Sequence, residues 1–330
     1  MKSVLFIFVL FIQVEAMAQN SSTYSSLIKG ARGAYETKDY TASAHLFSEA
    51  FKAANDKAPV NDRYDAACSW ALSGVADSSF VQLFRIAEKG NYTNVNHIST
   101  DTDLSSLYND ERWKKVIDIV TANKVRMEAN YDKALVALLD TVFQDDQKYR
   151  KELKAIEEKY GYDSEEMRNH WNIIHKKDSI NLIKVSTILD ERGWLSADII
   201  GNQGNNTLFL VIQHSDLPTQ EKYLPMMREA VKKGNAKANS LALLEDRVAL
   251  RRGGKQIYGS QVTRDSETNE YYVLPLIDPV NVDARRAEVG LGPLSDYISN
   301  WGMTWDVDEY IRKLPEYEAK QKNDDFVIWL

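Results

Sequence analysis

Apolar and polar residues alternate with a helical period along most of the chain. Residues 24–54 form a pattern that predicts two amphipathic helices, interrupted near residues 38–40, and residues 64–90 repeat the same scheme. Three positions of the first stretch recur in the second at one constant spacing: Ala34, Phe47 and Ala50 correspond to Ala71, Phe84 and Ala87. Small residues allow paired helices to approach closely, and the phenylalanine fills the space between them.

This N-terminal pattern resembles the tetratricopeptide repeat, and residues 100–118 look like the divergent unit that closes such an array. The usual proline of the repeat is not in place, and Ser43 stands where alanine is commoner. The resemblance implies contact with a protein partner. The alternative interpretation is a helical cap for the domain that follows, because two units are fewer than the ~3 that usually give independent stability.

From about residue 130 the pattern predicts long helices whose apolar faces contain polar side chains. These side chains are Asp146, Arg150, Asp178, Asn181, Gln220, Asp246 and Arg247. An amide buried without a partner costs ~1–3 kcal/mol, and a carboxylate costs more. We therefore expect the groups to converge, either as an internal network, in which Asp146 pairs with Arg150 and Asp246 meets an arginine of another helix, or as a functional cleft.

A histidine and an aspartate follow an apolar run at residues 208–212. If that run is helical, His214 and Asp216 point ~200° apart, because successive residues turn by ~100°. Asp216 is then the N-cap of the next helix, and His214 lies at a helix C-terminus. Gly201 and Gly204 permit close contact between helices.

After the glycine pair at 253–254, two short β-like runs flank a polar turn, which predicts a hairpin. Gln256 and Tyr258 face one way by strand parity, and Gln261 joins them only if Gly259 carries a bulge. A last short helix should end at Gly290. The fold class we expect is mainly α, with tetratricopeptide-like hairpins followed by a helical domain that carries a small β-hairpin.

The second part of the chain contains an ordered set of motifs: a D-Q-x-x-R helix at Asp146, a D-x-x-N step at Asp178, Gly193 with Trp194, "QHSD", Gln220, "DR" at 246–247 and "QIYGSQ". This set resembles a bacterial domain-of-unknown-function family, DUF6624. Leu195 replaces a proline and Ser260 a threonine of its pattern. The resemblance brings no established activity. It implies that one set of residues belongs together: Asp146, Gln147, Arg150, Asp178, His214, Asp216, Gln220, Asp246, Arg247, Gln256, Tyr258 and Gln261.

The first residues predict a secretory signal, with Lys2, an apolar stretch that ends at Val14 and the small residues Ala16 and Ala18 before a cleavage point. We expect four parts: a signal peptide at 1–18, the repeat region at 19–125, the helical domain at 130–300 and a C-terminal tail at 301–330. The protein should be exported, to the periplasm or beyond, with no membrane insertion after cleavage.

Composition narrows the function further. The formal charge of −7 argues against binding to nucleic acid. Cys68 is the only cysteine, so no internal disulfide can form. The chain has no HExxH motif, no cysteine pair, no G-x-S-x-G elbow and no phosphate loop, so we expect neither a metal nor a cofactor.

Three hypotheses of function remain. The first is a binding module for a protein or for a polar small molecule or peptide, whose ligand is held by Asp146, Gln147, Arg150, Asn181, Gln220, Arg247, Gln256, Tyr258 and Gln261. The second is a hydrolase-like or transferase-like enzyme, with His214 as general base and Asp178 or Asp246 orienting it. The third is a scaffold without a ligand.

Overall fold

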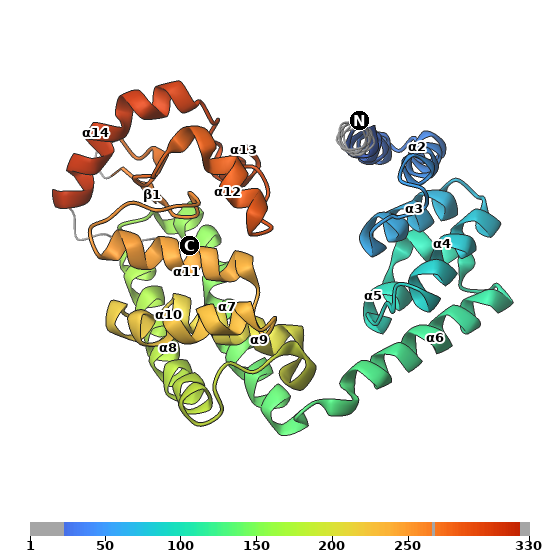
Figure 1. Ribbon diagram of the computed structural model, residues 1–330, viewed down its shortest axis with the longest axis horizontal. Coiled ribbons are helices and arrows are strands. Elements are labelled where there is room, and N and C mark those ends of the chain that lie inside the picture. The colour runs from blue at the N-terminus through green and yellow to red at the C-terminus, as the bar shows by residue number, and fades with distance from the viewer. Residues whose placement is uncertain (1–22, 266–267, 324–330) are drawn as a thin grey trace, which may run out of the picture. The chain divides into compact units, whose positions relative to one another are not determined.

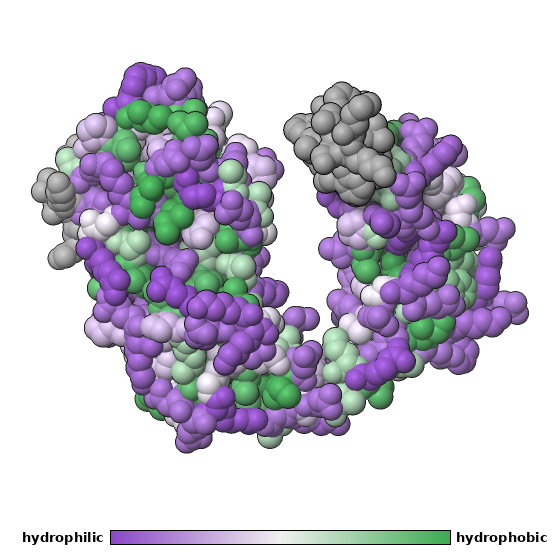
Figure 2. Space-filling model, in the orientation of Figure 1, coloured by the Kyte–Doolittle hydropathy of each residue, from purple (hydrophilic) through white to green (hydrophobic). Residues whose placement is uncertain are grey.

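The computed structural model describes residues 23–265 and 268–323, so the expected signal peptide lies outside the described residues. The chain divides into two compact units between Ala129 and Asn130. None of the described helices combines the length and apolar character that a bilayer crossing requires. Hydrophilic residues cover most of the surface in view, and hydrophobic residues appear on it in small patches (Figure 2).

The first unit is built from helices that pack in chain order. Residues 23–36 are helical. The elements that follow are α2 (Tyr40–Ala53), α3 (Val60–Leu72), α4 (Ala76–Glu88), α5 (Val95–Thr100), η1 (Thr102–Leu107), α6 (Glu111–Met127) and η2 (Glu128–Asn130). Helix α2 packs on α3, α3 on α4 and α4 on α6. Phe47, Ala50, Ala71 and Ala87 are buried, as an interhelical role requires. The assignment of these helices to tetratricopeptide repeats stays a prediction.

The second unit is a helical layer with a small appended sheet, as the sequence predicts (Figure 1). Its long helices are α7 (Lys133–Tyr160), α8 (Glu165–Arg192), α9 (Ala197–Gln213), α10 (Leu217–Lys232) and α11 (Ala238–Arg251). Helix α9 contacts the other four. It is the most apolar of the five in sequence, and most of its residues from Gly204 onward are buried. Side chains of α7, α10 and α11 meet at the C-terminal end of α9.

The hairpin and the remaining helices complete this unit. Strands β1 (Val262–Arg264) and β2 (Tyr271–Val273) pair antiparallel. They are followed by η3 (Pro279–Asn281), α12 (Val282–Glu288), α13 (Leu294–Ile298), η4 (Ser299–Trp301) and α14 (Val307–Asn323). Residues 301–330 were expected to be a tail. In their described part, α14 instead packs against the hairpin, where Tyr310 is buried and donates a hydrogen bond to the Leu274 carbonyl at 2.9 Å.

The two glycines of α9 have different roles. Gly204 lies against α7, because a Cβ there would be 3.1 Å from Leu139 Cδ1. Gly201 instead interrupts the helix, with φ 70° and ψ 166°. Essentially only glycine adopts that backbone conformation. The close-contact role expected for both glycines thus applies to Gly204, while Gly201 forms a kink.

We predict that Gly201→Ala destabilises the second unit by ~1–3 kcal/mol, because a Cβ strains this backbone conformation. The Cβ would also be 3.4 Å from the Tyr131 ring. Urea unfolding followed by tryptophan fluorescence measures the loss. Gly292→Ala is the control, since it has ordinary φ and no atom within 4 Å of the added Cβ. Equal stability of the two variants would contradict the assignment of strain to residue 201.

Candidate functional site

The C-terminal end of α9 joins three helices of the second unit. The Gln213 carbonyl accepts one hydrogen bond from Gln220 Nε2 of α10 and another from Arg247 Nη1 of α11, both at 2.8 Å. The last carbonyls of a helix have no partner within the helix, so these two side chains satisfy an acceptor that the fold buries. Gln213, Gln220 and Arg247 are each at most 3% exposed.

The next residue, His214, is the first of a series of ionisable side chains in contact with one another. His214 is the C-cap of α9, and its Nδ1 lies 2.8 Å from Asp146 Oδ1 on α7. Arg150, one turn along α7, lies 3.3 Å from Asp146 Oδ1. Arg150 also donates two hydrogen bonds to Asp178 on α8, at 3.0 and 2.8 Å. Such bidentate pairing fixes the guanidinium plane and ties α7 to α8.

A pocket of about 280 Å³ opens beside these side chains. Its lining residues are Asp146, His175, Asp178, Ser179, Leu182, Val211, Ser215 and Asp216. We call it the aspartate pocket. Among the described residues, three carboxylates, two hydroxyls and the imidazole of His175 line it, and no lysine or arginine does. Asp146 is 1% exposed and lies deep in the pocket, whereas Asp178, at 19%, lies nearer its mouth.

The protonation states of the buried pair follow from their surroundings. Burial lowers the pKa of His214 below its ordinary 6.5, and the charges of Arg150 and Arg247 act in the same direction, against the hydrogen bond to Asp146. Burial would raise the pKa of Asp146, but His214 and Arg150 together lower it. The lowered pKa of His214 means that its imidazole is neutral at pH 7, so an imidazolium charge is not what lowers the pKa of Asp146. We assign an ionised Asp146 and a neutral His214, because Arg150 already supplies the positive charge.

The tautomer of His214 follows from that assignment. A neutral imidazole must carry its proton on Nδ1 to donate to the Asp146 carboxylate, which leaves Nε2 as an acceptor. Nε2 is buried and has no hydrogen-bond partner among the described residues. The His214 side chain is 4% exposed and is not part of the pocket lining. The basic nitrogen is therefore buried and does not belong to the pocket lining.

Asp246 occupies a separate place. Its carboxylate accepts backbone N–H hydrogen bonds from Ile257 at 2.6 Å and from Tyr258 and Ser260 at 3.0 Å each. The prediction that Asp246 pairs with an arginine of another helix is wrong, because three backbone N–H groups are its hydrogen-bond donors instead. Burial raises the pKa of Asp246, and these N–H groups oppose the shift. Asp246 ties the loop before β1 to α11 and does not orient His214.

The glutamines of the "QIYGSQ" segment form part of the same internal network. Gln256 Oε1 accepts from the Gln261 backbone N–H at 2.8 Å, and Gln256 Nε2 donates to the Gln261 and Leu274 carbonyls. Arg247 Nε donates to Gln261 Oε1 at 3.0 Å. Gly259 has φ 68°, as the expected bulge requires. Gln256 and Gln261 do meet, but Tyr258 contributes its backbone N–H to Asp246, and no hydrogen bond of its side chain to them is present.

The structure therefore separates the expected site residues into two groups. Asp146 and Asp178 line the aspartate pocket, and Arg150 pairs with both of them. Gln147 donates to Asp146 Oδ2 at 2.8 Å. Gln220, Asp246, Arg247, Gln256 and Gln261 are internal ties. Asn181 is fully buried on α8, and its amide donates to the Val142 carbonyl at 3.4 Å. The expected orienting acids for His214, Asp178 and Asp246, are both wrong, since Asp146 is the acid that His214 contacts.

Two pocket residues, Ser179 and Ser215, were missed from sequence. The buried anchor Gln213, which does not line the pocket, was missed as well. Ser179 and Ser215 each follow a residue that the motifs mark, Asp178 and His214, and that adjacency was the signal available. Asp216 was expected to be an N-cap, and this is confirmed, because its carboxylate accepts from the Thr219 N–H at 3.0 Å. The same carboxylate also lines the pocket.

Two groups of side chains in the described part of the chain have the chemistry of metal ligands. In the first, ligand atoms of Asp146, Asp178 and His214 all lie within 4.8 Å of one another. The guanidinium of Arg150 contacts both carboxylates, so a metal ion would have to displace a resident cation.

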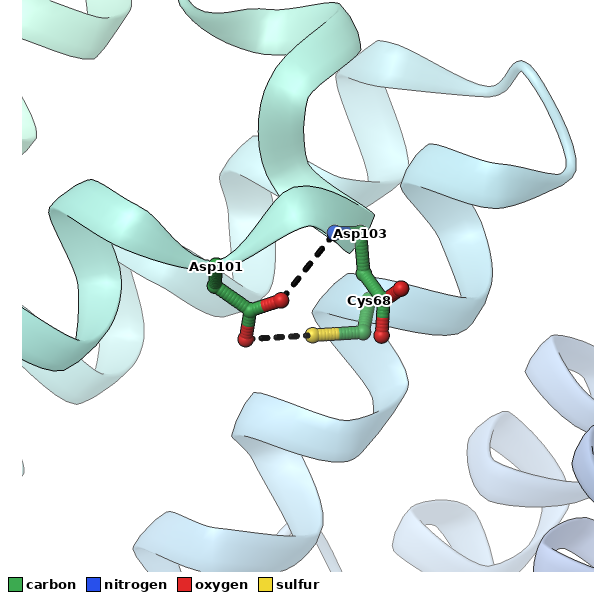
Figure 3. Close-up of side chains that lie close together, drawn as sticks. All are labelled: Cys68, Asp101 and Asp103. Carbon is green, nitrogen blue, oxygen red and sulfur yellow. Dashed lines mark hydrogen bonds between the residues drawn. The ribbon is translucent and has the colours of Figure 1, made fainter.

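The second group is Cys68, Asp101 and Asp103 in the first unit (Figure 3). Asp101 caps η1 by accepting the Asp103 N–H at 3.0 Å, and it also accepts the Tyr64 hydroxyl at 2.8 Å. Cys68 Sγ lies 3.8 Å from Asp101. Burial and the nearby aspartates raise the pKa of the Cys68 thiol, so at neutral pH it is not the thiolate that metals bind. Neither group is assigned to a metal.

The second unit is thus a mainly helical domain whose polar residues divide between an internal network and an acidic pocket. Its sequence matches the model of a family of unknown function, DUF6624, over residues 135–307. That match covers more than half of the chain, and the protein belongs to this family. No curated protein and no solved structure matches the chain.

We predict that Asp246→Asn destabilises the protein by ~1–3 kcal/mol, because the amide cannot accept all the backbone N–H groups that the carboxylate holds. Asp178→Asn should cost less, ~1 kcal/mol, since Arg150 keeps Asp146 as a partner. Thermal midpoints of the two near-isosteric variants give the comparison. A larger decrease in the thermal midpoint for Asp178→Asn would contradict this prediction. It would show that the Arg150–Asp178 ion pair between α7 and α8 stabilises the protein more than the backbone hydrogen bonds to Asp246.

We also predict that stability falls as pH drops below about 6.5, the ordinary pKa of histidine. The pKa of His214 is lower in the folded protein than in the unfolded chain. As the pH falls, the unfolded chain therefore binds a proton at His214 before the folded protein does, and the free energy of unfolding decreases. Asp146 adds the same sign only below its ordinary 3.8. Urea unfolding of wild type and His214→Gln at pH 7.5 and pH 5 isolates the effect. The variant should lose less stability between the two values, and an unchanged difference would refute the assignment.

Proposed function

We propose that the second unit is a binding module for a small organic amine, held in the aspartate pocket. The observation that carries the proposal is the lining itself: Asp146, Asp178 and Asp216 line one cavity. The described residues of that lining include the imidazole of His175 but no lysine or arginine. Arg150 offsets one of these charges through its two ion pairs, so a net negative charge remains. A cation is attracted to such a pocket, and the attraction strengthens where the walls are poorly solvated.

The shape and the neutral lining support a ligand of modest size. About 280 Å³ is near the lower end of the ~300–1,000 Å³ that small-molecule sites occupy. Leu182 and Val211 provide an apolar wall, and Ser179 and Ser215 provide hydroxyls. A ligand with an ammonium group, a short carbon chain and one further polar group would complement these surfaces. The sequence suggested that glutamine amides and Arg247 hold a polar ligand, but Gln220, Gln256 and Arg247 donate hydrogen bonds inside the protein instead.

An enzyme is the second candidate, and one observation favours it. The Asp146–His214 hydrogen bond places the His214 proton on Nδ1 and leaves Nε2 basic, which is the arrangement of an oriented general base. Catalysis would require a movement that brings Nε2 to the pocket, since Nε2 is buried and His214 does not line it. Asp146 is the orienting acid in this proposal.

For the rest of the chain the proposals rest on sequence. The tetratricopeptide-like pattern supports contact between the first unit and a protein partner. The signal-like residues 1–18 support export to the periplasm or beyond. A scaffold without a ligand becomes the better proposal if the pocket takes up no small molecule.

The test uses two probes of similar size and opposite charge, ethanolamine and glycolate, in ligand-observed NMR at low ionic strength. Ethanolamine should bind with millimolar affinity and should be displaced by salt, because the pocket is acidic. Asp178→Asn should weaken its binding, and Asp308→Asn, an exposed acid of α14 outside the pocket, should not. Preference for glycolate, or equal loss in both variants, would refute the amine proposal.

A further inference from the structure

The first unit contains a basic pocket. The inference drawn from it is independent of the amine ligand proposed for the second unit. The volume of the pocket is about 250 Å³. In the part of the chain that the structure describes, it is lined by Lys57, Arg63, Arg85 and Lys89 with a single carboxylate, Asp56. The whole chain carries a formal charge of −7, so a pocket lined mainly by positive charges is not expected from its composition. Like charges gathered in one cavity raise the free energy of the fold unless an anion offsets them.

The two arginines hold an oxyanion already. Asp56 Oδ1 accepts from Arg63 Nη2 at 3.0 Å and from Arg85 Nη1. Burial would raise the pKa of Asp56, but the two arginines lower it, so the carboxylate is ionised. The Arg63 side chain is 9% exposed and also donates to Gln82 Oε1 at 2.9 Å. This part of the pocket is a preformed receptor for an oxygen anion, with a side chain of the protein in place.

The two lysines have no such partner. Lys57 and Lys89 are exposed, and in the described part of the chain neither ammonium has an ion pair or a hydrogen bond. The C-terminal dipole of α4 explains a preference for cations at Arg85 and Lys89. It does not explain Arg63, which lies in the first turns of α3, where the helix dipole is positive. The preference for cations at a helix end therefore accounts for only part of the cluster.

The start of α3 adds donors of its own. Pro59 is the N-cap of α3 and provides no side-chain cap, so the first N–H groups of this helix have no side-chain partner there. Val60, the first residue of α3, lines the pocket, together with Ala58 and Ile86. Free N–H groups at a helix start favour an anion, and the three apolar side chains offer a surface for a carbon substituent next to it.

We propose that this basic pocket binds a small organic anion through its carboxylate or phosphate group. The anion lies between the two lysines and Arg85, beside Asp56, and its apolar substituent packs on Val60 and Ile86. The shared chemistry is that of an oxyanion with a short apolar group. The two sources, carboxylate and phosphate, are distinguished by the probes below.

Isothermal titration calorimetry of the full chain in low-salt Tris tests the proposal with three probes: inorganic phosphate, N-acetylleucine and N-acetylleucinamide. N-acetylleucine or phosphate should bind, and the uncharged amide should not. Binding of N-acetylleucine but not phosphate assigns a carboxylate ligand, and the reverse assigns a phosphate. If the amide binds as well as the acid, or if neither anion binds, the proposal is wrong.

The variants separate binding from folding. Lys57→Gln with Lys89→Gln removes two charges that make no hydrogen bond or ion pair among the described residues, and it should weaken anion binding by ~10-fold or more. Lys115→Gln with Lys133→Gln removes two exposed lysines outside the pocket and should leave binding unchanged. Asp56→Asn should strengthen binding, because the resident carboxylate is lost. A purely structural cluster would show lower stability in Asp56→Asn and no gain of affinity, and that outcome would overturn the proposal.

Discussion

The second unit depends on how the buried end of α9 is satisfied. Helix α9 contacts all four other long helices, so its C-terminal carbonyls cannot turn to water. Gln220 and Arg247 both donate to the Gln213 carbonyl, and His214 binds Asp146 on α7. These contacts set the position of α10, α11 and α7 around one point. The aspartate pocket lies beside that point, and the spacing of its walls follows from it.

Two adjacent residues of α11 show how opposite charges are buried without pairing with each other. Asp246 is held by backbone N–H groups of the loop before β1, and Arg247 by the oxygens of Gln213 and Gln261. Among the described residues, neither side chain forms a hydrogen bond with an oppositely charged group. Burial lowers the pKa of Arg247 to about 9. Both orientations are fixed by directional hydrogen bonds, which specify one position for the hairpin on α11 at a cost in desolvation.

Features that depend on residues close together in the chain could be predicted from the sequence. Helical periodicity, the Asp216 N-cap and the hairpin depend on neighbouring residues, and all three are confirmed. The partners of the buried charges depend on which residues the packing brings together. The sequence offered Asp178 and Asp246 as partners of His214, and only the register of α7 against α9 shows that the partner is Asp146. The donors to Asp246 are backbone groups, which leave no mark on residue type, so composition could not reveal them.

The buried thiol of Cys68 has a practical consequence. It is 5% exposed, its pKa is raised and it is the only cysteine of the chain, so it reacts slowly with thiol-specific labels. A cysteine introduced at an exposed position in either unit would therefore accept a spin label or a fluorophore selectively, without removal of the native residue. Pairs of such positions make the arrangement of the two units, with and without ligand, directly measurable in solution by distance spectroscopy.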